Sequence, residues 1–300
     1  MSTPEPLPDV EDTASPYSLV PTPATFVRNL AKELDGGEVK LPSFPEVAMR
    51  VQRVLEDPRG TALQVAQVLG SDAALAARVL RIANSATFNP TGKPITDLQT
   101  AVGRLGGALV RSAAVSFAFR QSQEAGRYPA LWPTLQELWR KGTLVAAIAY
   151  VLARETGAAK PDAALVTGLL HNVGRLYILE RIHDKSQGVP DAAVWDQILH
   201  DWHPRLGRLI LEHWKFDPAI VAAVADQNAW NRPISASDRL TDVLVAATSL
   251  VPCVFCRDLI EHTVASVPSF ERLGLAAAEC NALLTRTAQQ VKSLRDALAG

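Results

Sequence analysis

Apolar residues recur at helical spacing through almost the whole chain after Ala24, and this periodicity limits the fold more than any other feature. In PEVAMRVQRVLEDP, residues 45–58, the apolar side chains share one helix face, one proline suits the first turn, and another ends the helix. The sequence shows none of the alternating Val, Ile and Thr runs, bounded by turn residues, that indicate β-strands. We therefore predict an all-α fold.

Capping residues mark where several helices begin. Thr61 and Gln64 form a capping box before ALQVAQVL, and Asp72 and Asp97 can cap the two helices that follow. In the second half of the chain, prolines, glycines and capping residues again set the helix ends. There we expect long helices at 133–156, 162–181 and after Asp191, shorter ones after Pro204 and Pro218, and long ones from about Asp238 and about Leu275.

Composition and turn residues divide the chain into three parts. Residues 1–23 hold six prolines, four acidic residues and no Lys or Arg. Such a segment cannot bury enough apolar surface to offset its ordering entropy, so we expect a disordered tail. Glycine and proline cluster again between residues 124 and 133. We therefore expect an N-terminal helical lobe at 24–126 and a second helical lobe at 127–300.

Composition also narrows the class of protein. A chain of 300 residues with 48% hydrophobic content can bury a large core. Three cysteines argue against a disulfide framework, no run reaches the roughly 20 apolar residues of a membrane span, and the first residues lack a secretory signal. The net charge is −1, so the chain without the four acids of the tail carries +3, too little to indicate nucleic acid. We expect a cytoplasmic protein.

Two blocks of sequence stand out together. The first, residues 41–114, contains LPSFPEVA, RIANSA and AVGRLG in that order, and the second contains GLLHNVGRLYIL and, further on, WHPRLGRLILEHWKFDPAIVAAVADQN. Over roughly residues 38–250 the chain resembles the HD-related output domain (HDOD) family, which bacteria use in signalling. The resemblance implies an N-terminal helical bundle packed on a lobe built like the HD phosphohydrolases.

In the HD phosphohydrolases a histidine, an adjacent His-Asp pair and a distant aspartate hold a divalent metal, which activates water and stabilises charge on a phosphoryl group. By this resemblance Lys141 stands at the first histidine, and His171 with Asn172 stands at the pair. A protonated lysine has no lone pair to give a metal, and a neutral amide replaces the carboxylate. His171 would then be a helix histidine held by a hydrogen bond.

The later ligand positions differ as well. Gln227 and Asn228 stand where relatives often have two histidines, and Thr248 stands at the last aspartate, with Asp242 the nearest carboxylate in that helix. We therefore predict no metal, no cofactor and no catalytic residue. The set that remains either packs or binds a small ligand, with two cationic side chains supplying positive charge. We call it the remnant pocket: Lys141, His171, Asn172, Arg175, Gln227, Asn228 and Thr248.

Two other clusters have structural explanations, which are helix-cap and surface roles for two histidines and packing for two cysteines. His200 and His203 are three residues apart, but Pro204 biases His203 away from helical dihedral angles, which weakens the pair as a metal site. Cys253 and Cys256 form a CxxC without the second pair that a zinc ribbon needs. We expect these cysteines to be two buried small residues on one helix face.

Four arginines in the first block are candidate partner-binding residues: Arg78, Arg81, Arg104 and Arg111. The arginine fork matches an acidic partner or a phosphate, while solvated or helix-tying roles are the alternative. Basic residues are not interleaved with aromatic ones, which argues against nucleic acid. All six tryptophans lie in the second lobe, where packing is expected, and an exposed one would mark a contact surface.

These observations lead to one main hypothesis and two alternatives. The main hypothesis is a cytoplasmic, non-catalytic signalling or regulatory protein that binds a partner protein or a small effector, with changes between the lobes as its output. The alternatives are an HD-type metal phosphohydrolase, for instance on a cyclic dinucleotide, using His171 with unusual ligands, and a nucleic-acid-binding regulator. The segments outside the resemblance are too short for a large sensor, so we expect input from another protein and no membrane contact. The sequence does not determine the partner or the oligomeric state.

Overall fold

The structure is a computed structural model that describes residues 28–33, 46–124, 131–185, 192–230 and 239–299. Within these ranges the chain forms helices and turns without a strand, which confirms the all-α prediction. The predicted tail, residues 1–23, lies outside the described residues, as do residues 125–130 at the predicted lobe boundary.

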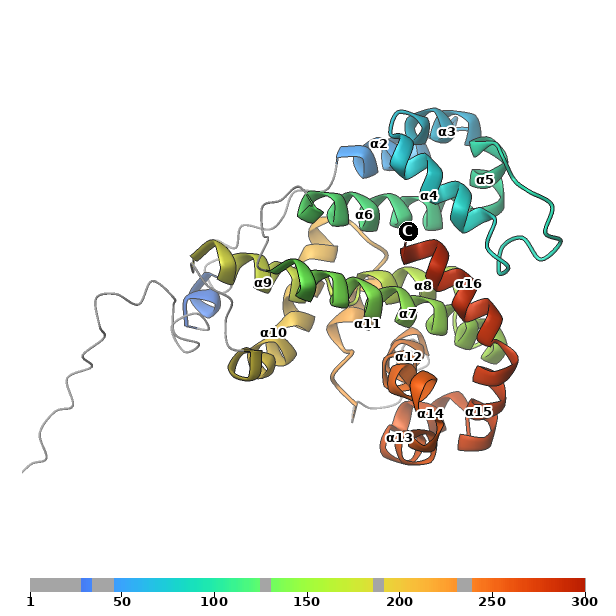
Figure 1. Cartoon of the computed structure of the whole chain (residues 1–300). Helices are drawn as coiled ribbons and strands as arrows, with labels where there is room; N and C mark the ends of the chain where they lie inside the picture. The colour runs from blue at the N-terminus through green and yellow to red at the C-terminus, as the bar shows by residue number, and fades with distance from the viewer. Residues whose placement is uncertain (1–27, 34–45, 125–130, 186–191, 231–238, 300) are drawn as a thin grey trace, which may run out of the picture.

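The N-terminal part is a bundle of short helices stacked on one longer helix. Figure 1 shows α2 to α5 gathered at one end of the molecule, above α6. Their starts follow the predicted caps: Gln64 N–H donates to Thr61 Oγ1 at 3.3 Å, and Asp72 and Asp97 accept from the first turns of their helices. The helices are α2 (Glu46–Glu56), α3 (Ala62–Gly70), α4 (Ala73–Ala83), α5 (Leu98–Leu105) and α6 (Gly107–Glu124).

The rest of the chain surrounds one long central helix, α7. Every residue of its apolar segment from Leu144 to Ala153 is buried, so this part of α7 is a core helix packed on all sides. Gly157 ends α7 in the left-handed region, with φ 63°. The helices are α7 (Trp132–Thr156), α8 (Pro161–Leu170), α9 (Val173–Lys185), α10 (Ala192–His213), α11 (Pro218–Ala225), α12 (Arg239–Phe255), η3 (Arg257–Leu259), α13 (Ile260–Ser266), α14 (Pro268–Leu273), α15 (Ala277–Arg286) and α16 (Ala288–Ala299).

Three of the predicted helix bounds are wrong. The helix expected at 162–181 is two helices, because Gly168 brings α8 against α7 and Gly174 brings α9 against α10. An added Cβ would lie 2.5 Å from Ala146 Cα at Gly168 and 2.1 Å from the His203 carbonyl oxygen at Gly174. The long helix expected from Leu275 is α15 and α16, which are preceded by α13 and α14.

The third wrong bound is the helix start expected at Pro204, which instead lies inside α10. Proline has no N–H for the carbonyl four residues earlier, that of His200. Asn228 supplies the missing donor, since its Nδ2 lies 2.7 Å from the His200 oxygen. The helix continues through the proline with this carbonyl satisfied by Asn228, 28 residues further along, and by His203 Nδ1, which lies 3.0 Å from it.

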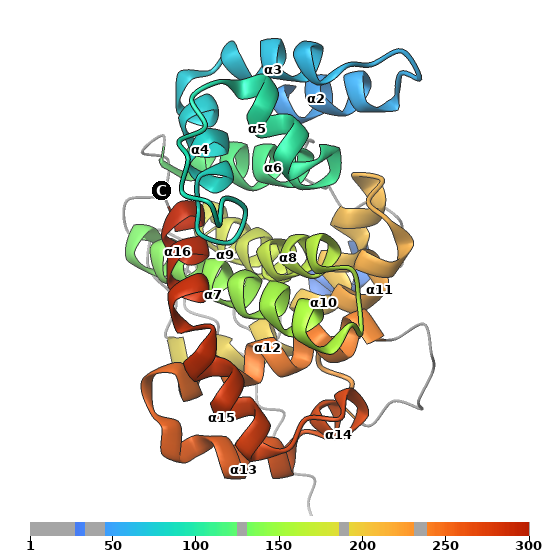
Figure 2. The same cartoon turned by 90° about the vertical axis from the view of Figure 1, so that its right-hand side faces the viewer.

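The two ends of the described chain pack on parts that are distant in sequence. Residues 28–33, assigned above to the N-terminal lobe, contact α9 through an ion pair between Glu33 and Arg181. Helix α16 runs along α7 and reaches α4 (Figure 2). Just beyond the end of α4, the Ala86 N–H donates to Ser293 Oγ of α16 at 2.9 Å. The buried apolar residues of both lobes form one continuous core. None of the described helices is both long and apolar enough to cross a membrane.

Candidate functional site

All seven residues of the remnant pocket line one cavity of about 340 Å³. It lies between α7, the turn that joins α8 to α9, α10, the end of α11 and α12. Among the described residues that line it, none is an Asp or a Glu. The cavity is also lined by Leu138, Val145, His200, His203, Trp230, Val245, Ser249, Val251 and Pro252.

His171 is buried at the end of α8, in the turn rather than within a helix. Its Nδ1 lies 2.6 Å from the carbonyl oxygen of Gly168, which can only accept, so Nδ1 carries the proton. Burial lowers the pKa of His171 to about 4, and the charge of Arg175 lowers it further, against the opposing hydrogen bond to Gly168. The imidazole is therefore neutral at pH 7, held by the hydrogen bond that the sequence predicts.

His203 repeats this arrangement on α10. It is buried, its Nδ1 lies 2.7 Å from the Leu199 carbonyl oxygen, and burial together with Arg175 lowers its pKa to about 3. Because α10 continues through Pro204, His203 is helical and its ring centroid lies 6.4 Å from that of exposed His200. The predicted departure of His203 from helical geometry is thus wrong, and both histidines line the pocket.

The two amide side chains at the end of α11 hold the main chain around the pocket. Gln227 Nε2 donates to the His171 carbonyl oxygen at 3.2 Å and to that of Val224 at 2.8 Å. Asn228 donates to the His200 oxygen, as described above. Both residues are therefore engaged with carbonyls on neighbouring elements.

Two cationic side chains contribute the pocket's positive charge. Arg175 is partly buried on α9, and its Nε is buried without a hydrogen-bond acceptor among the described residues. Burial lowers the pKa of Arg175, and the charge of exposed Asp196 opposes that effect. Lys141 is exposed on α7, 3.5 Å from Glu137, whose carboxylate also accepts two hydrogen bonds from Arg140.

Helix α12, the last of the helices that line the pocket, contributes hydroxyl groups to it. The carboxylate of this helix does not line the pocket. Thr248 Oγ1 donates to the Leu244 carbonyl oxygen at 2.9 Å. Asp242 is buried, where Arg272 Nε and Ser269 Oγ each donate to its Oδ1 at 2.9 Å. The carboxylate of this helix that lies nearest the pocket therefore accepts hydrogen bonds from two residues of α14.

The donor set of this pocket does not fit the divalent ion of the HD phosphohydrolases. Hard divalent ions at phosphoryl-transfer sites need anionic oxygen ligands beside imidazole. Here two neutral imidazoles stand with amides and two cations, and the described lining contributes no carboxylate. No group of three or more His, Cys, Asp or Glu side chains with metal-binding geometry occurs in the described ranges.

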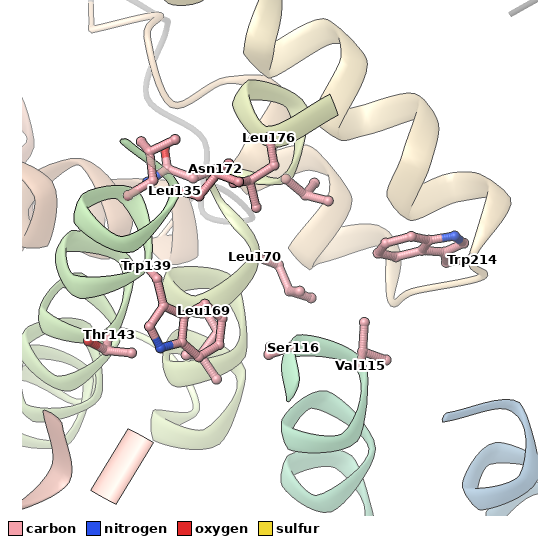
Figure 3. Close-up of a pocket in the computed structure, with 13 residues that line it drawn as sticks. Val115, Ser116, Leu135, Trp139, Thr143, Leu169, Leu170, Asn172, Leu176 and Trp214 are labelled. Carbon is pink, nitrogen blue, oxygen red and sulfur yellow. The ribbon is translucent and has the colours of Figure 1, made fainter. Parts of the chain in front are cut away.

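A second, enclosed cavity of about 30 Å³ lies next to the remnant pocket, between the lobes. Figure 3 shows Val115 and Ser116 of α6 on one side of the cavity, with Leu170 and Trp139 on the other. Its lining is almost entirely apolar, and Ser116 Oγ is buried there without a hydrogen-bond partner among the described residues. Asn172 lines both cavities and so connects the pocket to the lobe interface.

The four candidate partner-binding arginines do not share one surface. Arg78 is buried, with its guanidinium 5.2 Å from the Phe117 ring centroid and 5.4 Å from that of Trp139. It therefore joins α4 to α6 and α7 and has no surface to offer a partner in this conformation.

Arg111 also joins the lobes. Its Nη2 donates to the Trp214 carbonyl oxygen at 2.8 Å and lies 3.3 Å from that of Lys215, and its guanidinium stacks 4.4 Å from the Phe216 ring centroid. Arg104 donates to the Phe88 carbonyl oxygen at 3.1 Å. Arg104 and Arg81 are exposed, and their role in partner binding stays a prediction.

Several pocket residues escape the sequence reasoning, among them one aromatic and one hydroxyl side chain that could contact a ligand. Trp230 is 45% exposed and lines the pocket, although the sequence indicates only that an exposed tryptophan would mark a contact surface. Ser249 lies next to predicted Thr248. Their closeness along the chain to Asn228 and Thr248 is the signal that could have found them. The CxxC prediction is half wrong, since Cys253 is buried but Cys256 is exposed beyond the end of α12.

Comparison with known proteins now adds to this geometry. A solved structure from Shewanella amazonensis, named as a proposed metal-dependent phosphohydrolase, is 25% identical with a TM-score of 0.74, covering 92% of this chain and 98% of its own. An HDOD domain protein of unknown function from Geobacter sulfurreducens is 23% identical with a TM-score of 0.63, covering 90% and 96% of the two chains.

A protein of Treponema pallidum, uncharacterised by name, is 24% identical over 202 residues. That match covers 61% of this chain and 37% of the relative, so the chain spans little more than a third of that protein. The HDOD domain itself matches residues 41–230, more than half of the chain. The chain therefore belongs to the HDOD family.

Proposed function

We propose that this protein is a signalling or regulatory protein that acts by binding, and that its HD-like lobe is not a metal hydrolase. The HDOD family supports the signalling part of the proposal. The lining of the remnant pocket supports the binding part. Partners and cellular location stay predictions from the sequence.

One observation carries the non-catalytic assignment: cations and neutral amides line the pocket where HD enzymes place metal ligands. Metal-assisted hydrolysis needs a bound divalent ion to lower the pKa of water. Lys141 and Arg175 would repel such an ion, and Gln227 is held by its bonds to two carbonyls. The described lining contributes no carboxylate that could offset this repulsion.

The main competitor is a metal-dependent phosphohydrolase, which the name of the Shewanella amazonensis relative suggests. In that case the pocket would hold a metal through His171 and His203, whose Nδ1 atoms already donate to carbonyls, and the metal would displace the hydrogen bond between the His203 ring and Gln227. The competitor therefore predicts that activity depends on both imidazoles.

Elemental analysis of the purified protein and hydrolysis assays decide between the two. The substrates are bis(p-nitrophenyl) phosphate and a cyclic dinucleotide, with Mn²⁺ or Mg²⁺ added. We expect metal well below one equivalent and the same background turnover in wild type and His171→Gln. About one equivalent of metal, with turnover that is lost in His171→Gln and kept in an exposed-site control, His262→Gln, would overturn the proposal.

A further inference from the structure

At the cationic end of the remnant pocket, one guanidinium nitrogen lacks a hydrogen-bond partner. Arg175 Nε is buried, and within the described chain no acceptor reaches it. Its electrostatic neighbours are exposed Asp196 and the two neutral histidines. A buried donor without an acceptor is costly, and an anionic ligand would remove that cost. Lys141 adds a second positive charge at the same pocket, and its partner Glu137 is shared with Arg140.

The shape of the arginine group favours a phosphoryl anion. A guanidinium presents donors in a planar fork that matches two phosphate oxygens, and a nearby ammonium supplies a further charge. No described lining residue is acidic, and the nearby carboxylate of Glu137 is paired with Arg140 and Lys141. Thr248 and Ser249 place hydroxyl groups on the α12 side of the same cavity.

The same pocket also carries an exposed aromatic ring and a set of amides. The indole of Trp230 is 45% exposed, which is unusual for so large an apolar side chain, and a heterocyclic base can stack on such a ring. Asn172 and Asn228 can both donate and accept, as recognition of base edges requires. Neutral His171 keeps Nε2 as an acceptor for a ligand N–H or O–H, whereas the His203 ring already hydrogen-bonds the side chain of Gln227.

From these groups we infer that the remnant pocket binds a nucleoside monophosphate, with Arg175 and Lys141 on the phosphate and Trp230 against the base. The cavity of about 340 Å³ lies at the small end of the roughly 300–1,000 Å³ typical of ligand pockets, which suits one small molecule. The inference rests on the proposed function, because it assigns the pocket to binding without turnover.

Isothermal titration calorimetry of the full chain in EDTA tests the inference. The probes, at constant ionic strength, are AMP, GMP, CMP, UMP, adenosine, ribose 5-phosphate and inorganic phosphate. We expect at least one monophosphate to bind at least about tenfold more tightly than ribose 5-phosphate, because stacking is absent in the sugar phosphate. The same nucleotide should bind more tightly than its nucleoside, because the charged hydrogen bonds are absent there.

Substitutions test the phosphate-binding end and the base-binding end of the pocket separately. Arg175→Gln should lower the affinity for the monophosphate about tenfold or more and leave the affinity for the nucleoside unchanged. Trp230→Leu should lower the affinity for the monophosphate to that for ribose 5-phosphate and leave inorganic phosphate unchanged. Arg286→Gln and Phe255→Leu, an exposed arginine and an exposed aromatic outside the pocket, are the matched controls and should bind as wild type does.

Three results would contradict the inference: ribose 5-phosphate or inorganic phosphate binding as tightly as every monophosphate, pocket variants behaving like the controls, or no binding of any probe. In each case the proposed function stands as long as the hydrolysis assays are negative. The converse is also distinguishable: a monophosphate that binds in EDTA and is hydrolysed when Mn²⁺ is added would overturn the proposed function and support the ligand class.

Discussion

The two buried histidines of the pocket define its chemistry at the scale of single residues. Each uses Nδ1 to donate to a carbonyl of its own helix, so each is fixed in one tautomer. Burial and the nearby charge of Arg175 keep both rings neutral at pH 7, with pKa values of about 4 and 3. Neutral histidines beside a charged arginine suit a ligand that brings both an anion and hydrogen-bond donors.

These histidines should make the protein less stable in mild acid. Between pH 6.5 and about 4 each ring is protonated in the unfolded chain but neutral in the folded one, so the unfolded state binds more protons and stability falls as pH falls. The expected slope is about 1.4 kcal/mol per pH unit for each histidine. Urea denaturation at several pH values from 6.5 to 4.5 measures it.

Removing one histidine isolates its share of that slope. In the His171→Asn variant, the free energy of unfolding should change with pH less steeply than in wild type, by about 1.4 kcal/mol per pH unit. This difference in slope is expected whatever the absolute stability of the variant. His213→Asn, at an exposed position at the end of α10, should keep the wild-type slope. Parallel curves for wild type and His171→Asn would show that His171 is protonated in the folded protein.

At the scale of elements, glycines set how closely the helices around the pocket approach one another. Gly174 of α9 meets α10 at His203 and at Gly207, whose nitrogen would lie 2.8 Å from an added Cβ. The contact is backbone against backbone, so no side chain can move aside. The spacing of α9 and α10, and with it the position of Arg175 near His203, depends on this contact.

Gly174→Ala should therefore destabilise the protein by about 2 kcal/mol or more, since α9 must move away from α10. The matched control is Gly103→Ala on α5, where an added Cβ meets nothing within 4 Å. That change should stabilise the protein by about 0.5–1 kcal/mol, as expected for alanine in an exposed helix. Chemical denaturation of both variants checks the pair, and equal effects would contradict the role given to Gly174.

Helix ends that depend on neighbouring residues can be predicted from the sequence, and those that depend on distant contacts cannot. Thr61 with Gln64 and Gly157 belong to the first kind, because their hydrogen bonds stay within a few residues. Pro204 belongs to the second, because one donor to the carbonyl that the proline leaves open is Asn228 on another element, beside His203 of α10 itself. The turn at His171 is also of the second kind, since the glycines on either side of it, Gly168 and Gly174, pack against two different helices.

The same distinction holds for the candidate site. The resemblance to HD enzymes brings six positions together, to which the charge argument adds Arg175, and the structure places all seven around one cavity. The resemblance does not reveal that Trp230 also lines this cavity or that Arg78 is buried, because exposure is a property of the folded chain. Side-chain type alone cannot tell an arginine that binds a partner from one that joins two lobes.

At the scale of the whole molecule, the lobes are joined by contacts between segments far apart in sequence. Arg111 of α6 binds the carbonyls at the end of α10, and α16 returns from the far end of the chain to α4. The arginine charge also suits the negative end of the α10 dipole. The lobes therefore share one core, and movement between them would require these contacts to change.

Arg111→Ala should destabilise the protein by about 2–3 kcal/mol, through loss of its hydrogen bonds to carbonyls and its stacking on Phe216. Arg81→Ala, at an exposed position on α4, should change stability by no more than about 0.5 kcal/mol. Urea denaturation followed by both circular dichroism and tryptophan fluorescence measures the difference. Equal stability of the two variants would remove the structural role assigned to Arg111.

The amides at Gln227 and Asn228 have a consequence for how this pocket can change over time. Each holds a main-chain carbonyl, so a substitution toward an imidazole gives up a scaffold hydrogen bond as it adds a ligand. Rebuilding metal chemistry would therefore need compensating changes elsewhere, with unstable intermediates between. The two hydrogen bonds therefore make these amides costly to replace by metal ligands in any descendant of this chain.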